Sequence, residues 1–211
     1  MNQSYGPHRL VIQYMSILEA APTIVEQVEK RVFGAIDEKI HEWVKSQSDW
    51  DGVFDYIEDE TYFKPMSWEK DENDNPCASY ALFCEDDGEY LHYLSALLSV
   101  VPYRFGILFE VKTSWITGRN GRVARPGAAW KRYLAEQFTQ TRLAESGFEL
   151  QGESVFLPIR VDARVLAEAY PDSLDDALVP IDEALRKLGV AHPTIEAFLK
   201  AAQKYQFTKS V

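Results

Sequence analysis

The stretch that most constrains the fold is Arg104 to Trp115, which reads RFGILFEVKTSW. Apolar side chains occupy every second position of its first part, namely Phe105, Ile107, Phe109 and Val111. This period of two, carried by β-branched and aromatic residues, predicts a strand. Leu108 lies among the intervening positions, so the first half of this strand is apolar on both faces. We therefore expect a central strand that is covered on both sides near its start.

The rest of the chain alternates between helical and extended patterns. Apolar residues spaced by three or four predict helices over 22–45, 89–101, 126–146, 163–170, 173–188 and 193–205. Short strands are expected around 54–56 and 62, over 78–83, and once or twice within 148–161. Asn120-Gly121 favours a hairpin that returns along 122–124, whereas residues 10–18 fit either a short strand or a helix start.

This order of elements predicts the α+β class. We expect a mostly antiparallel sheet of about five strands, with helices on at least one face and a helical C-terminal end over 162–205. A chain of 211 residues is long enough to bury one sizeable core, so we expect a single domain over 1–211.

Composition points to a cytoplasmic protein without a cofactor. The longest apolar run, 91–109, is interrupted by His92, Pro102 and Arg104, so it does not predict a membrane span. The N-terminus lacks the basic start and apolar core of a signal peptide. The two cysteines, Cys77 and Cys84, are too few for a disulfide framework or a zinc site, and we expect reduced thiols.

Charge is distributed unevenly along the chain. The net charge is −11, yet residues 49–89 alone carry fourteen Asp and Glu against Lys64 and Lys70, a net charge of −12. Residues 104–142 carry eight Lys and Arg against Glu110 and Glu136, a net charge of +6. One acidic segment, 49–89, and one basic segment, 104–142, therefore dominate the electrostatics.

The acidic segment has two interpretations. In the first it is a solvated antiparallel meander whose exposed face is acidic. In the second it is a recognition surface for a basic protein partner, in which aromatic anchors supply binding energy and the carboxylates select the encounter. The residues expected to bind that partner are Glu58, Asp59, Glu60, Tyr62, Trp68, Asp86 and Asp87. Nucleic acid is not expected on this segment, because like charges repel.

A short motif near the end of the central strand suggests chemistry. Glu110 and Lys112 share one face of that strand, because side chains alternate along it. A carboxylate that binds a divalent metal beside a charge-stabilising ammonium suits phosphodiester hydrolysis. Glu110-Val111-Lys112 resembles the ExK half of the active site in PD-(D/E)xK nucleases.

The resemblance implies that Glu110 and Lys112 act in catalysis together with an acidic metal ligand upstream. The nearest candidates are Asp86 and Asp87, although the helix predicted over 89–101 stands where that family has a hairpin. The alternative is that the Glu110 and Lys112 side chains form a structural ion pair across the strands.

A basic segment over 119–132 provides the third candidate surface. Arg119, Arg122 and Arg125 crowd the expected hairpin, where they could contact a phosphate or nucleic acid, or neutralise the acidic segment. The chain contains no Walker-type loop, no Gly-x-Ser-x-Gly elbow, no His-Glu-x-x-His and no Cys-x-x-Cys.

Three functions thus remain open. The first is a non-enzymatic interaction protein, of inhibitor or immunity type, that binds a basic partner through 49–89. The second is a metal-dependent nuclease that uses Glu110 and Lys112. The third is a structural subunit of a larger complex, in which both charged segments are contacts.

Overall fold

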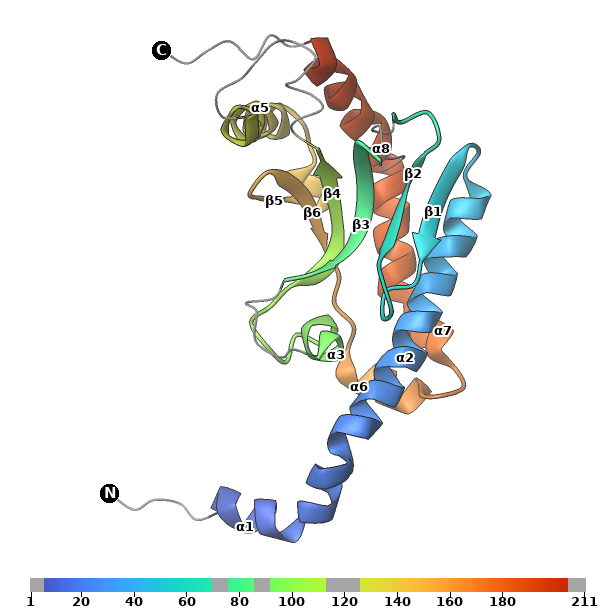
Figure 1. Ribbon diagram of the computed structural model, residues 1–211, viewed down its shortest axis with the longest axis vertical. Coiled ribbons are helices and arrows are strands. Elements are labelled where there is room, and N and C mark those ends of the chain that lie inside the picture. Colours follow the sequence, from blue (N-terminus) through green and yellow to red (C-terminus); the bar gives the residue numbers. More distant parts are fainter. Residues whose placement is uncertain (1–5, 70–75, 86–91, 113–125, 205–211) are drawn as a thin grey trace, which may run out of the picture.

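The computed structural model describes residues 6–69, 76–85, 92–112 and 126–204, and it confirms the α+β class. Within these residues one antiparallel sheet has six strands in the order β1-β2-β3-β4-β6-β5 (Figure 1). The strands are β1 (Trp50–Phe54), β2 (Thr61–Pro65), β3 (Ala78–Cys84), β4 (Phe105–Val111), β5 (Glu149–Gln151) and β6 (Ser154–Pro158). The helices are α1 (Gly6–Gln13), α2 (Met15–Ser46), α3 (Tyr93–Leu97), α5 (Pro126–Gln140), α6 (Ala163–Ala169), α7 (Leu174–Ala177) and α8 (Val179–Lys204), with a 3₁₀ turn at Ala144–Ser146.

The predicted central strand is confirmed as β4, which lies between β3 and β6. Its residues from Phe105 to Phe109 are buried, and Glu110 is the first exposed position. The region 148–161, where one or two strands were expected, supplies both β5 and β6. The return strand expected over 122–124 lies outside the described residues.

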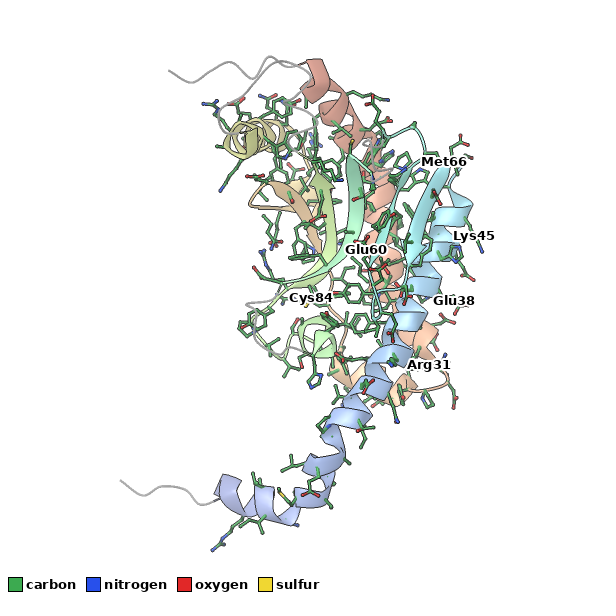
Figure 2. The ribbon with its side chains drawn as sticks, viewed as in Figure 1. Arg31, Glu38, Lys45, Glu60, Met66 and Cys84 are labelled. Carbon is green, nitrogen blue, oxygen red and sulfur yellow. The ribbon has the colours of Figure 1, made fainter. Side chains whose placement is uncertain are left out.

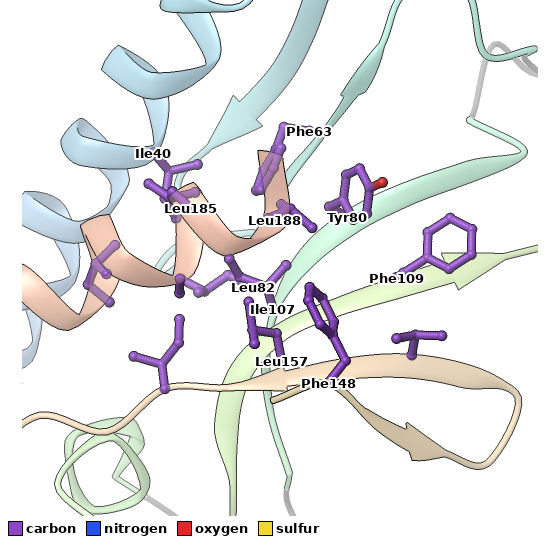
Figure 3. Packing of buried hydrophobic residues seen from close by; sticks show 14 of the residues in the cluster. Ile40, Phe63, Tyr80, Leu82, Ile107, Phe109, Phe148, Leu157, Leu185 and Leu188 are labelled. Atoms are coloured by element: carbon purple, nitrogen blue, oxygen red, sulfur yellow. The ribbon is translucent and has the colours of Figure 1, made fainter. Parts of the chain in front are cut away.

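The long helices α2 and α8 cover one face of the sheet (Figure 1). Arg31, Glu38 and Lys45, each seven residues apart, lie on the outer side of α2 and are exposed (Figure 2). The core forms between these two helices and the inward-facing side chains of alternate strand positions (Figure 3). The labelled members of this core include Ile40, Phe63, Leu82, Ile107, Leu157, Leu185 and Leu188.

The N-terminal part of the chain is helical, whereas the sequence was compatible with either a strand or a helix there. Residues 10–18 belong to α1 and α2, and α2 begins at Met15, seven residues before Pro22, the predicted start. Pro22 is exposed inside α2, so the carbonyl that loses its amide partner can bind water. The apolar spacing predicted the helix correctly, but its start was wrong.

The C-terminal helices also differ from the prediction. Asp162 caps α6, since its carboxylate accepts from the Arg164 and Val165 amides at 2.9 and 3.0 Å, as predicted. In contrast, α8 runs without a break through Gly189 and Pro193, where one helix was expected to end and another to begin. A Cβ at Gly189 would lie 3.5 Å from the Trp43 ring, so packing of α8 on α2 outweighs the local helix-breaking propensity.

The helix predicted over 89–101 is shorter in the structure. Only Tyr93–Leu97 is helical in α3, and residues 86–91 lie outside the described part of the chain. Glu29 of α2 is 9% exposed, and its carboxylate accepts a hydrogen bond from the Leu94 amide at 2.9 Å. A side chain from a distant helix therefore accepts a hydrogen bond from a backbone amide of the first turn of α3, which has no acceptor within the helix.

A histidine of helix α8 forms a hydrogen bond with a tyrosine of the sheet. The Tyr80 hydroxyl and His192 Nδ1 are 2.8 Å apart, and the imidazole packs against Trp50 and Trp68. Burial lowers the pKa of His192 below 6.5; Glu196 opposes this effect and Lys200 adds to it.

The lowered pKa of His192 predicts how stability depends on pH. Below about pH 6.5 the His192 side chain is protonated in the unfolded chain, whereas in the folded protein it stays neutral until the pH falls through its lower folded pKa. The free energy of unfolding therefore decreases as pH falls from 6.5 through the folded pKa. We expect His192→Gln to weaken this decrease. Urea unfolding of wild type and His192→Gln between about pH 5 and pH 8 measures the free energy of unfolding of each protein. If this free energy depends on pH equally in the two proteins, the prediction is wrong.

Candidate functional site

The candidate site is a depression of about 390 Å³ on the sheet face opposite α2 and α8. Tyr80 and Phe109 are paired across β3 and β4 and point toward α8, so the neighbouring Ser79 and Glu110 point to the other face. Four strands contribute to its lining, because β2, β3, β4 and β6 are adjacent in the sheet. The side chains that carry the argument are Glu60, Tyr62, Glu110, Lys112, Glu153 and Ser154.

Two carboxylates approach each other in this depression. Glu60 directly precedes β2, and Glu110 lies near the end of β4. Glu110 is exposed as a residue, yet its carboxyl group is partly shielded from water inside the depression. This desolvation raises the pKa of Glu110 above 4.5, and repulsion from Glu60 raises it further. Among the described residues no cation forms an ion pair with either carboxylate.

A third carboxylate, that of Glu153, comes from the turn between β5 and β6. The Trp130 indole N–H donates to the Glu153 carbonyl at 2.7 Å, which ties this turn to α5. A Cβ on Gly127 would overlap Oε1 of Glu153, so glycine at the first turn of α5 leaves room for the carboxylate. The positive end of the helix dipole stabilises a negative charge at that position.

The depression unites residues that the sequence assigned to separate functions. Glu60 and Tyr62 were expected to bind a protein partner, whereas Glu110 and Lys112 were candidates for catalysis. Glu153 was not predicted, and its place beside them follows from the strand order, which no local pattern reveals.

Other predicted contact residues lie elsewhere. Glu58 and Asp59 are exposed in the turn between β1 and β2, and Glu58 pairs with Lys30 of α2 at 3.4 Å. Trp68 is only 6% exposed and contacts the rings of Tyr80 and Phe109. Trp68 is thus part of the core, and we do not include it in the binding surface.

Several candidate residues lie outside the described part of the chain. They are Asp86, Asp87, Arg119, Arg122 and Arg125. Glu85, the described residue before Asp86, pairs with Arg104 at 3.1 Å at the start of β4, whereas Glu110 lies toward the other end of that strand. Within residues 6–69, 76–85, 92–112 and 126–204, no three His, Cys, Asp or Glu side chains are grouped closely enough to hold a metal ion.

Comparisons with known proteins do not assign the site. The chain matches no protein family, no curated protein and no solved structure. Among the described helices, none combines the length and apolar character needed to cross a membrane.

Proposed function

We propose that this chain is a non-enzymatic interaction protein, of inhibitor or immunity type, that holds a Lys or Arg side chain of a basic protein partner in the acidic depression. The observation that carries the proposal is the pair of adjacent carboxylates, Glu60 and Glu110, which have no ion-pair partner among the described residues. Two like charges at close range repel each other, and a cation inserted between them adds two attractions that offset this repulsion.

The surroundings of the two carboxylates suit a cationic side chain. Tyr62 is half-buried in the wall of the depression and offers an aromatic surface for the aliphatic stem or the charged group. Ser79 and Ser154 add hydroxyl groups that accept hydrogen bonds. Counting Glu153 and Lys112 as well, the formal charge of the lining is −2 when all four groups are ionised.

Neutralising the carboxylate pair tests the proposal. Glu60→Gln/Glu110→Gln should weaken binding of a fluorescent arginine-rich peptide about tenfold, because the peptide loses both attractions. Fluorescence anisotropy at pH 8 measures the dissociation constant with the carboxylates ionised, and repeating the titration at high salt shows the electrostatic share.

A matched control removes the same charge elsewhere. Glu38 and Glu42 are exposed on α2, and Glu38 lies away from the sheet face that carries Glu60 (Figure 2). Glu38→Gln/Glu42→Gln should change the dissociation constant by less than about twofold. Equal weakening by both double variants would show that the peptide senses only net charge, and the proposal would then be abandoned.

The alternative function is a metal-dependent nuclease. One observation favours it: Glu110 and Lys112 share the depression with a second carboxylate, that of Glu60, which directly precedes β2. Cleavage of DNA or RNA in the presence of Mg²⁺ or Mn²⁺, lost in Lys112→Ala, would support this function over the binding role.

A further inference from the structure

A second pocket, of about 480 Å³, lies at the opposite end of β4 from the acidic depression and shares no lining residue with it. It is lined by the start of β4 at Phe105, by the end of β6 at Leu157 and Pro158, and by the first turns of α8 from Pro180 to Lys187. Its volume falls within the range that is usual for small-molecule sites, about 300–1,000 Å³. Neither the proposed partner site nor the alternative nuclease site uses this pocket.

The walls of this pocket are mostly apolar and are fixed by the fold. Phe105 and Leu157 are buried members of the core that also line the pocket. Pro158 and Pro180 are half-buried, so their rings retain apolar surface that a ligand can cover. The chain after β6 is held in place by a backbone hydrogen bond, in which the Ile159 amide donates to the Phe105 carbonyl at 2.8 Å. The pocket is therefore preformed, as small-molecule sites usually are.

The charged side chains of the lining favour a ligand with one negative charge. Three cationic residues stand against two acidic ones, so the formal charge of the lining is +1; they are Arg104, Arg160 and Lys187 against Glu149 and Glu183. This sign is opposite to that of the acidic depression and of the whole chain. One carboxylate balances this charge, whereas the two glutamates would repel a doubly charged phosphate monoester more strongly.

Two of the three cations are available to a ligand. The Arg104 guanidinium already donates to Glu85 at 3.1 Å and to Glu149 at 2.9 Å. In contrast, Arg160 and Lys187 are exposed and form no hydrogen bond or ion pair with the described part of the chain. They reach the pocket from two different walls, because Arg160 follows β6 and Lys187 belongs to α8. A guanidinium also matches a carboxylate with two parallel N–H donors.

We infer that this pocket binds a small organic acid that has an apolar body and a single carboxylate. The body packs against the proline rings and the core side chains of β4 and β6, and the carboxylate binds Arg160 and Lys187. Burial of the body supplies most of the binding energy, and the charge selects the acid over neutral compounds of the same shape. The inference does not depend on the proposed function, because the two sites share no residue.

Removing the two unpaired cations tests the site in the full chain. The probe is pyrenebutyrate, a fluorescent apolar carboxylate, and pyrenebutanol is its neutral analogue. Fluorescence titration of wild type should give a dissociation constant on the order of 10 µM for pyrenebutyrate. Arg160→Gln/Lys187→Gln should weaken this binding about tenfold, because the carboxylate loses both cations. The same variant should change the dissociation constant of pyrenebutanol by less than about twofold.

A matched control removes the same two charges outside the pocket. Lys45 and Arg186 are exposed, and neither lines the pocket, although Arg186 adjoins Lys187 in the sequence. Lys45→Gln/Arg186→Gln should leave the dissociation constant of pyrenebutyrate within about twofold of wild type. Equal weakening by both double variants, or unchanged binding in both, would overturn the inference. Failure of wild type to bind pyrenebutyrate below about 1 mM would overturn it as well.

A third variant should have the opposite effect. Glu183 is exposed, lines the pocket and lies one turn before Lys187 on α8. Glu183→Gln removes a repulsion, so it should strengthen the binding of pyrenebutyrate about threefold and leave that of pyrenebutanol within about twofold of wild type. Weaker binding of pyrenebutyrate in this variant would overturn the placement of the carboxylate beside α8.

Discussion

Gly106→Ala should lower the free energy of unfolding by about 3 kcal/mol or more. Gly106 lies in the buried first half of β4, where a Cβ would overlap the Leu157 carbonyl oxygen and lie 2.9 Å from the Phe156 ring. Because the carbonyl is backbone of the neighbouring strand β6, relief would require the paired strands to separate. Urea unfolding followed by circular dichroism measures the change.

The same substitution at another glycine provides the control. Gly34 is exposed within α2, and no atom lies within 4 Å of a Cβ built there. Gly34→Ala should therefore raise the free energy of unfolding by up to about 1 kcal/mol, because alanine favours the helix. Equal effects at the two sites would contradict the close approach of β4 and β6.

Phe33→Ala should lower the free energy of unfolding by about 3–5 kcal/mol. Phe33 is fully buried in α2, and its ring centroid lies 5.2, 6.1 and 5.5 Å from those of Tyr56, Tyr93 and Phe105. One side chain thus connects α2 with the β1–β2 turn, α3 and the central strand. Its removal leaves a cavity that three elements line, and none of them can close it alone.

A truncation at the surface separates this effect from the general cost of losing apolar atoms. Val100 is 72% exposed, so Val100→Ala should change the free energy of unfolding by no more than about 0.5 kcal/mol. Urea unfolding measures both variants, with the m-value as a check that the unfolded states are comparable. A loss below about 1 kcal/mol in Phe33→Ala would show that Phe33 does not join these elements.

Local patterns predicted most elements, but not where several of them begin and end. The alternation from Phe105 to Val111 located β4, and Asp162 located the start of α6. In α8, however, the usual signals at Gly189 and Pro193 did not divide the helix. Packing on α2 and the sheet stabilises this helix more than one glycine and one proline destabilise it.

For the candidate site as well, the sequence identified most of the residues but not which of them lie together. Glu60, Tyr62, Glu110 and Lys112 were identified in the sequence from charge and spacing, but as members of different hypotheses. Glu153 carried no signal that distinguished it from other turn residues. Its membership depends on the placement of β6 beside β4, a pairing of residues that are 46 to 52 positions apart in the sequence.

By itself, the sequence determined the α+β class, the central strand and the concentration of acidic charge in 49–89, because periodicity and composition are local properties. Only the tertiary structure decided which acidic residues meet, that Trp68 is buried, and that the apolar residues 10–18 are helical and exposed. These outcomes depend on strand order and on packing between distant segments, whose energies no short window of sequence contains.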